Sequence, residues 1–154
     1  MVFDPAMREF LERFEGTPHV QRRREAGRGV DCIQLVIGAL EAGGAFPPVT
    51  LPSYLQTNGF SRGRNHIADH FIACVHAESI PIGNWEPREG DVGIFKSGRH
   101  SNHVGIVAAG RFWHATKTAG AHHTAIAAVE RHLQEIIRIH QPGLKENPAN
   151  RTLR

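Results

Sequence analysis

The chain has 154 residues and a mass of 17.0 kDa, the size of one domain with a sizeable hydrophobic core. Hydrophobic residues make up 40% of the sequence and charged residues 21%, a balance that excludes collagen-like, coiled-coil and disordered proteins. The formal net charge is +3, and no apolar run reaches the roughly 20 residues that a membrane-spanning helix needs. We therefore expect one domain over residues 1–154 and no membrane partner.

The N-terminus and the cysteines bear on location and redox chemistry. The first residues carry neither the basic nor the apolar stretch of a secretory signal, so we expect synthesis in the cytoplasm. The two cysteines, Cys32 and Cys74, are too few for a disulfide framework and match no zinc-binding spacing. We treat each as a separate thiol and expect no cofactor.

Arginines dominate the basic residues, accounting for 15 of the 18, and four of them lie shortly before Cys32. These four are Arg22, Arg23, Arg24 and Arg28. Guanidinium groups suit carboxylates and phosphates, so the cluster is a candidate substrate-binding site. Charge alone would also allow nucleic-acid binding, but no aromatic residues interleave with the arginines, and we expect no nucleic-acid partner. A solvated loop is the plain alternative.

The first part of the chain is predicted to be helical. Pro5 is a good helix entry, and apolar residues then recur at helical spacing until Gly16. Residues 17–29 are polar and Arg-rich, which is typical of a loop. Asp31 is the expected N-cap of a second helix, which is apolar on nearly all sides and ends at Gly43. Such a helix is usually buried in the middle of a domain.

The second part of the chain changes character after a third predicted helix over residues 65–75, which carries Cys74 on its apolar face. Short runs rich in Val, Ile and Phe follow, separated by Gly-containing turns, and they predict antiparallel strands. The predicted strands are 91–96, 102–108, 111–115, 124–129 and 136–140, with a hairpin turn at 109–110 and a turn of helix over 131–135. Helices followed by strands predict an α+β fold whose sheet packs on the central helix.

Cys32 is the expected first residue of that central helix. A helix N-terminus carries positive partial charge and free amide donors, which stabilise a thiolate and lower the pKa of a cysteine placed there. This context favours a reactive Cys32. The alternative is an inert buried thiol, which Cys74 illustrates in the middle of its helix.

Two histidines stand on neighbouring predicted strands and could assist Cys32. His103 begins one strand and His114 ends the next, eleven residues later across a tight turn. Residues so placed in a hairpin can lie side by side. Together with Cys32 they supply a nucleophile, a base and a polar group that orients the base.

Other histidines compete for a functional role. His66 and His70 are four residues apart on the third predicted helix and could share a metal ion, but the glutamate of the zinc-binding helical motif is missing. We therefore expect no metal site and interpret this pair as surface histidines. His100, His122 and His123 are expected in loops.

Four motifs follow one another along the chain: 16–18 (GTP), 29–36 (GVDCIQLV), 89–95 (EGDVGIF), and 103–107 (HVGIV) with 110–115 (GRFWHA). In this order they resemble the NlpC family of papain-like cysteine peptidases, which cut bacterial cell-wall peptides. The resemblance covers most of the chain and implies a papain-like fold. It also implies Cys32 as nucleophile, His103 as general base and acid, and His114 as the residue that orients His103.

The sequence departs from the family pattern at three positions. Ile33 and Gln34 stand where the family usually has Ser and Gly, and His19 stands where it usually has an aromatic residue. These differences affect the substrate side more than the triad, and His19 is a candidate for contact with the substrate or the oxyanion. The Arg-rich approach to Cys32 and the lack of a signal peptide or wall-binding module resemble the subset found in phage tails and prophages. Phage tail proteins are therefore predicted partners, with delivery to the cell wall by a phage-like particle.

The sequence thus predicts a cysteine endopeptidase that hydrolyses an amide bond in peptidoglycan stem peptides, after γ-D-Glu, through a Cys32 thioester. The carboxylates of these peptides would be bound by the four clustered arginines and by His19. Two alternatives stay open. One is a non-catalytic tail-assembly or wall-peptide-binding module, and the other is a thiol acyltransferase or amidase on the same fold.

Overall fold

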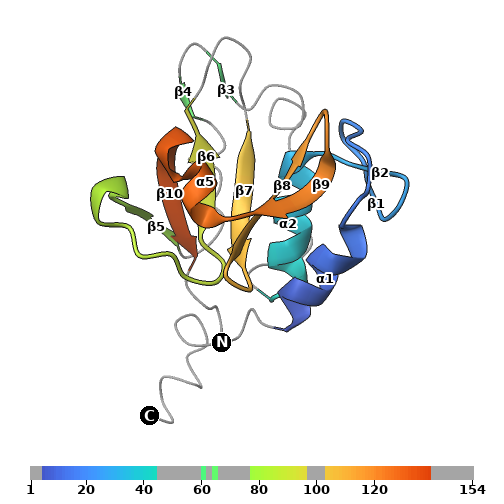
Figure 1. The fold of residues 1–154 in the computed structure, drawn as a ribbon, viewed down its shortest axis with the longest axis horizontal. Coiled ribbons are helices and arrows are strands. Elements are labelled where there is room, and N and C mark those ends of the chain that lie inside the picture. The colour runs from blue at the N-terminus through green and yellow to red at the C-terminus, as the bar shows by residue number, and fades with distance from the viewer. Residues whose placement is uncertain (1–4, 45–59, 62–63, 66–76, 97–102, 140–154) are drawn as a thin grey trace.

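The computed structural model describes residues 5–44, 60–61, 64–65, 77–96 and 103–139. Its main sheet has six antiparallel strands, with two helices packed on one face and a short helix on the other (Figure 1). The helices are α1 Ala6–Phe14, α2 Cys32–Ala42 and α5 Ile126–Val129, with 3-10 turns η1 Ile82–Asn84 and η2 Glu130–His132. The strands are β1 Arg24–Glu25, β2 Gly29–Val30, β3 Phe60–Ser61, β4 Arg64–Asn65, β5 Ala77–Ile80, β6 Val92–Phe95, β7 Val104–Ala108, β8 Arg111–Thr116, β9 Gly120–Thr124 and β10 Leu133–Ile139. The predicted α+β fold is confirmed.

Helices α1 and α2 form the layer that covers one face of the sheet. The Asp31 carboxylate caps α2 by accepting a hydrogen bond from the backbone N–H of Gln34 at 2.7 Å, as the sequence predicted. The two helices approach closely at Gly38, where a Cβ atom would collide with the ring of Phe10. The small residue therefore sets the spacing of the helix pair and leaves α2 buried against the sheet.

The strands of the main sheet lie in the order β5-β10-β6-β7-β8-β9, and every neighbouring pair is antiparallel. Side chains alternate between its two faces. On β8, Trp113 and Ala115 join the core beneath α1 and α2, whereas Phe112 faces the second core around Val129 of α5. His114 is in step with Phe112 and lies on the same face.

Several predicted elements differ from the observed ones. The segment 17–29, expected to be a loop, contains the β1–β2 hairpin. The strand expected over 124–129 was wrong: β9 ends at Thr124 and the next residues form α5, consistent with the high helix propensity of alanine. The helical turn expected over 131–135 lies earlier, in η2, and β5 was not predicted. The third predicted helix and Cys74 lie outside the described residues.

The far edge of the sheet is closed by the N-terminal segment. Gly16 donates its N–H to the carbonyl of Ala121, and Ala121 donates its N–H to the carbonyl of Thr17. Gly120 fits beneath this segment because it has no side chain; a Cβ atom there would collide with the Thr17 carbonyl. Strand β9 is therefore paired on both sides rather than left as an open edge.

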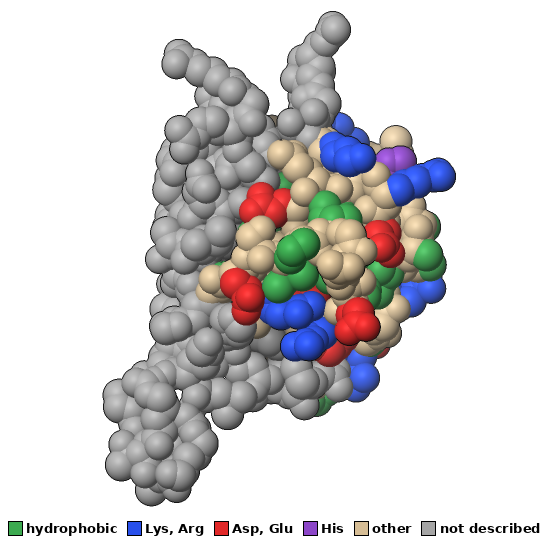
Figure 2. Space-filling model, turned by 90° about the vertical axis from the view of Figure 1, so that its left-hand side faces the viewer, with side chains coloured by type: hydrophobic (Ala, Val, Ile, Leu, Met, Phe, Trp, Pro, Cys, Tyr) green, Lys and Arg blue, Asp and Glu red, His purple; other side chains and the backbone are tan. Residues whose placement is uncertain are grey.

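Charges are mixed on the surface that Figure 2 shows, where basic and acidic side chains are interspersed among the described residues. Within the described part of the chain, no helix is long and apolar enough to span a bilayer.

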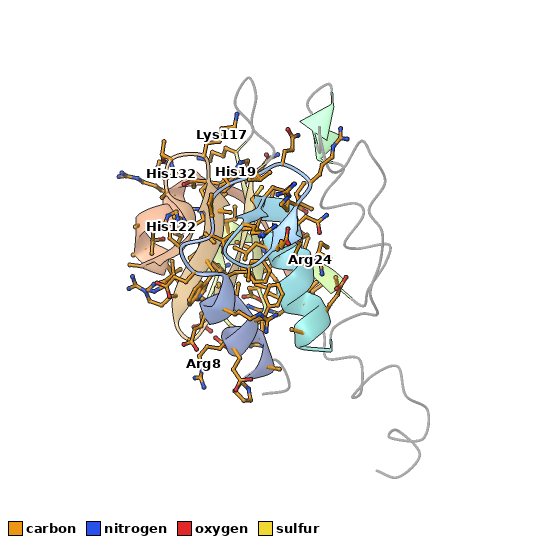
Figure 3. The ribbon with its side chains drawn as sticks, turned by 90° about the vertical axis from the view of Figure 1, so that its right-hand side faces the viewer. Arg8, His19, Arg24, Lys117, His122 and His132 are labelled. Atoms are coloured by element: carbon orange, nitrogen blue, oxygen red, sulfur yellow. The ribbon has the colours of Figure 1, made fainter. Side chains whose placement is uncertain are left out.

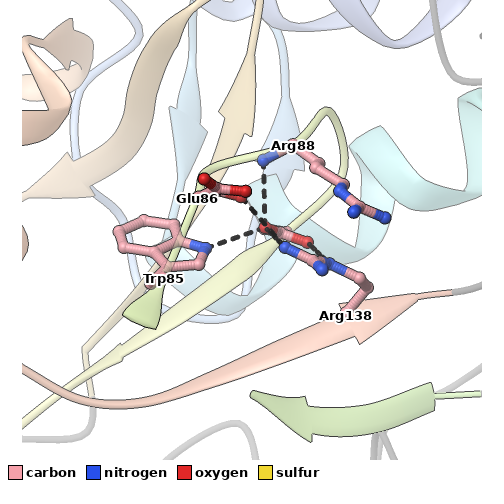
Figure 4. Close-up of polar contacts among 5 residues, drawn as sticks. Trp85, Glu86, Arg88 and Arg138 are labelled. Atoms are coloured by element: carbon pink, nitrogen blue, oxygen red, sulfur yellow. Dashed lines mark hydrogen bonds and ion pairs between the residues drawn. The ribbon is translucent and has the colours of Figure 1, made fainter. Parts of the chain in front are cut away.

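A buried carboxylate, Asp91, ties the start of β6 to β10 (Figure 4). It accepts hydrogen bonds from the indole N–H of Trp85 at 2.9 Å and from the backbone N–H of Arg88 at 3.0 Å. Arg138 donates to both carboxylate oxygens, at 3.0 and 2.9 Å, and also to the carbonyl of Glu86. The negative charge is fully compensated, so this network is a structural joint of the sheet.

We expect Asp91→Ala to lower the free energy of unfolding by about 3 kcal/mol, because it leaves the Arg138 guanidinium without its partner. Urea denaturation followed by circular dichroism measures the loss. Arg88→Ala is the matched control, since the hydrogen bonds between Arg88 and Asp91 use only the backbone N–H and carbonyl of Arg88. Equal stability of Asp91→Ala and the wild type would contradict a structural role.

Candidate active site

Cys32 is the first residue of α2, and its side chain is only 7% exposed. Pairing of β7 with β8 runs from Ala108 opposite Arg111 to Gly105 opposite His114 and goes no further toward the start of β7. At the next residue, the backbone N–H of Val104 is directed to the sulfur of Cys32. The thiol therefore sits where the two strands separate.

His103 immediately precedes Val104, so the chain brings its imidazole to the same end of the sheet as the sulfur. Its Nε2 lies 2.7 Å from Nδ1 of His114 on the adjacent strand. The ring of Phe95 packs against both imidazoles, with centroids 4.5 Å from His103 and 5.8 Å from His114. This packing restricts the rotation of both imidazoles and holds the pair in one orientation.

The hydrogen bond between the two histidines decides which nitrogen of each ring is available. It occupies His103 Nε2 and leaves His103 Nδ1 as the ring nitrogen that this bond does not use. His114 is 6% exposed, and its second nitrogen, Nε2, is buried without a hydrogen-bond partner among the described residues. An unsatisfied buried ring nitrogen is costly and calls for an explanation.

Burial dominates the ionisation of these three groups. It raises the pKa of Cys32 to about 12, although the Val104 N–H and the helix start act in the opposite direction. Burial lowers the pKa of His103 to about 3, with a further contribution from the neighbouring His114, and that of His114 to about 4. The expected lowering of the Cys32 pKa was wrong, because desolvation outweighs the helix N-terminus. The resting groups are a neutral thiol and two neutral imidazoles.

His19 lies next to this group in the structure. Its backbone pairs with Val30, two residues before Cys32, and its imidazole is close enough to influence the pKa values of both Asp31 and His103. Burial raises the pKa of Asp31, whereas the backbone N–H groups that donate hydrogen bonds to its carboxylate lower this pKa. The role predicted for His19, contact with the substrate or the oxyanion, stays a prediction.

The clustered arginines divide into two kinds. Arg24 lies along α2 (Figure 3), where its Nε and Nη2 donate to the side-chain oxygen of Gln34 and its Nη1 forms an ion pair with Glu41 at 2.7 Å. All three guanidinium nitrogens of Arg24 are thus engaged within the protein. The side chains of Arg22, Arg23 and Arg28 are exposed in the loop.

Backbone strain is stored at Arg22, whose φ of +66° lies in the left-handed region. Its N–H donates to the Asp31 carboxylate at 2.6 Å, and Asp31 also caps α2. One carboxylate therefore fixes both the loop and the helix that carries Cys32, and this contact holds the strained conformation in place.

A fourth histidine joins this group. This residue was expected in a loop from the sequence. His122 and His123 are in fact on β9, and the ring centroid of His122 lies 4.5 Å from that of His114. No local signal in the sequence distinguishes His122 from His123, and the place of His122 beside His114 comes from the register of β8 with β9. His66, His70 and His100 lie outside the described residues, and the described residues hold no group of three or more potential ligands for a metal ion.

Known structures share this fold. The NlpC/p60 domain of the peptidoglycan hydrolase SagA superposes with a TM-score of 0.53 and 16% identity, covering 87% of this chain and 97% of that domain. A protein described as similar to lipoprotein, of the NLP/P60 family, from Staphylococcus aureus subsp. aureus Mu50 gives a TM-score of 0.55 and 19% identity over 90% of this chain. This chain spans only 41% of the length of that second protein. No protein-family model and no curated protein sequence matches the chain.

The fold is therefore the papain-like α+β fold of NlpC/p60 domains, as predicted from the motif order. It brings together Cys32, His103, His114 and His19, and it adds His122. Arg24 is the one predicted substrate-binding residue whose polar groups are already engaged with α2.

The two buried histidines predict a pH dependence of stability. Their pKa values are about 3 and 4 in the folded protein and about 6.5 in the unfolded chain, so the unfolded chain binds more protons below pH 6.5. The contribution of these two histidines to the free energy of unfolding is fully present above pH 6.5. It falls as the pH drops toward 4, by up to about 1.4 kcal/mol per pH unit for each histidine.

Urea denaturation at several pH values checks this slope. We expect the variant with both His103→Gln and His114→Gln to lose stability less steeply than the wild type between pH 6.5 and 4. If the free energy of unfolding of both proteins depends on pH in the same way, these two histidines are not the groups that cause the loss of stability.

Arg24 should contribute to stability more than its neighbours do. We expect Arg24→Ala to lower the free energy of unfolding by about 1–2 kcal/mol, because Gln34 and Glu41 lose a charge-assisted donor. Arg28 is highly exposed and its nearest carboxylate is 3.9 Å away, so Arg28→Ala should change it by less than about 0.5 kcal/mol. Equal effects of the two substitutions in thermal unfolding would contradict the assignment.

Proposed function

We propose that this protein is a cysteine endopeptidase that hydrolyses an amide bond in peptidoglycan stem peptides. The observation that carries the proposal is the position of Cys32 at the start of α2, where the backbone N–H of Val104 is directed to its sulfur. Val104 directly follows His103, which is hydrogen-bonded to His114. The NlpC/p60 fold supports it, since one solved domain of this fold belongs to a peptidoglycan hydrolase. A nucleophile, a base and an orienting group are the parts that acyl transfer needs.

The reaction would begin from the neutral groups. The Cys32 sulfur attacks the amide carbon while His103 Nδ1 takes the thiol proton, and the carbonyl oxygen becomes an oxyanion. The backbone N–H of Cys32 at the helix start would donate to that oxyanion, with His19 as a candidate second donor. His114 Nδ1 accepts from His103 Nε2 and stabilises the imidazolium that forms.

Breakdown of this intermediate would expel the amine, which receives its proton from His103, and leave a thioester on Cys32. Water then attacks the thioester carbon with His103 as base, releasing a carboxylate and restoring the thiol. Because burial disfavours the separated charges of thiolate and imidazolium, proton transfer and attack by sulfur would occur together.

The substrate proposal rests on charge. Stem peptides carry free carboxylates, and the exposed side chains of Arg22, Arg23 and Arg28 lie in the loop that leads to Cys32. We propose cleavage after γ-D-Glu, with His19 and these arginines on the substrate side. Delivery to the cell wall with a phage-like particle is part of the same proposal and is a prediction from the sequence alone.

Incubation of the protein with defined stem peptides, with products identified by mass spectrometry, tests the proposal. We expect one new carboxylate and one new amine at the γ-D-Glu bond, with no cleavage by Cys32→Ala and almost none by His103→Ala. His114→Asn should retain more turnover than His114→Ala, because an amide can still hydrogen-bond to His103.

Two outcomes would count against this function. If no stem peptide is cut while acyl transfer from a thioester donor is observed, the result favours the acyltransferase function over the endopeptidase function. If stem peptides bind with the same affinity to the wild type and to Cys32→Ala but are never cleaved, the protein is a binding module.

A further inference from the structure

We propose that His122 is a positioning residue for the reaction, as the third member of a histidine chain that runs across β7, β8 and β9. In this chain His122 accepts the hydrogen bond of His114, as His114 accepts that of His103. The inference rests on the proposed function and adds a residue that the sequence motifs do not include.

The sheet register places His122 beside His114. The two residues are directly opposite each other in the β8–β9 ladder, so their side chains lie on the same face of the sheet. Their ring centroids are 4.5 Å apart at an interplanar angle of 40°. Figure 3 shows His122 on β9, on the side of the sheet away from α2. His122 thus follows His103 and His114 in a row across three neighbouring strands.

The hydrogen bonds define the tautomer of His122. Its Nδ1 lies 2.9 Å from the carbonyl oxygen of Gly120, which can only accept. Nδ1 therefore carries the proton, and Nε2 of the neutral ring is an unprotonated acceptor.

The same reasoning defines the tautomer of His114. For His103 to take a proton on Nδ1, its Nε2 must already carry one, and that N–H must donate to His114 Nδ1. The proton of neutral His114 is then on Nε2, the buried atom that has no hydrogen-bond partner among the described residues.

Among the rings that the structure describes around His114, one offers an acceptor for that proton. The rings in contact with His114 are those of Phe95, Phe112, His103 and His122. The phenylalanines have no lone pair, and His103 already donates to the other side of His114. A rotation of His122 that brings its Nε2 to His114 Nε2 would complete a chain from His103 to the Gly120 carbonyl.

The consequence for the reaction is electrostatic. A His114 ring that donates to His122 becomes a better acceptor for His103, because hydrogen bonds in a chain polarise one another. The imidazolium of His103 would be stabilised, and it exists only after proton transfer has begun. The effect should therefore appear in kcat rather than in KM.

His122→Phe and His122→Gln separate packing from hydrogen bonding in the full chain. Phenylalanine keeps the ring contact without an acceptor, and glutamine offers an oxygen acceptor that does not titrate. On a stem peptide we expect His122→Phe to lower kcat about tenfold with KM unchanged. His122→Gln should restore most of kcat. His123→Gln is the matched control, because His123 is the adjacent residue and contacts Trp113 on the other face.

The proposal is overturned if His122→Phe retains wild-type kcat, or if His122→Gln is as impaired as His122→Phe. If the wild type cleaves no stem peptide, the proposed function fails, and NMR of ¹⁵N-labelled histidines still tests the chain without a substrate. A His114 Nε2–H signal that shifts in His122→Phe but not in His123→Gln supports the hydrogen bond. An unchanged His114 signal in His122→Phe contradicts it.

Discussion

The backbone N–H of Val104 is directed to the Cys32 sulfur at the start of β7, where the start of α2 packs on the sheet. This contact forms at the point where the β7–β8 ladder ends, so the sulfur takes a donor that would otherwise lack a partner at that position. Because His103 precedes Val104, the same contact sets the position of the imidazole. The site therefore follows from where two strands separate, and needs no long loop to bring its parts together.

The thiol and the two histidines differ in exposure at the end of the β7–β8 ladder. The sheet alternates its side chains, so the core beneath α2 includes Ala115 while His114 lies on the opposite face with Phe112. Cys32 and His114 are buried, whereas His103 is half-buried. Loss of solvent around these groups favours their neutral forms.

Neutral groups at rest have a consequence for catalysis. The charge separation that accompanies sulfur attack is unfavourable in such surroundings unless donors and acceptors are already in place. The Val104 N–H on the sulfur and the His114 nitrogen on His103 are both present in the structure. In the proposed reaction, these groups would stabilise the state that forms during sulfur attack rather than a resting thiolate.

The sequence allowed prediction of the elements that carry local signals. Asp31 as a helix cap and the alternating strands β6, β7 and β8 were correct, because capping and side-chain period are visible in short windows. Strand β9 could not be predicted in the same way. Its sequence, GAHHT, has weak strand propensity, and its conformation depends on pairing with β8 and with the segment after α1.

The direction of the Cys32 pKa shift could not be predicted from the sequence for a related reason. The helix N-terminus is a local feature and indicates a low pKa, but burial results from the packing of α2 on strands about 70 residues away. The position of His122 was hidden likewise, since a pair of adjacent histidines after a turn gives no indication of which one faces a catalytic neighbour. Features that depend on the register between distant segments required the structure.

The departures from the family pattern at Ile33 and Gln34 have a physical explanation in the loop before Cys32. Ile33 is 4% exposed and belongs to the main core. The side-chain oxygen of Gln34 accepts hydrogen bonds from the guanidinium of Arg24. A glycine in place of Gln34 could not make this bond, so here the hairpin β1–β2 is attached to the first turn of α2 by a side chain. The Asp31 carboxylate attaches the same loop through Arg22. His19 and the exposed arginines are therefore carried by a segment that is attached to α2 at two points. The residues that we propose for substrate contact would thus be positioned before a ligand binds.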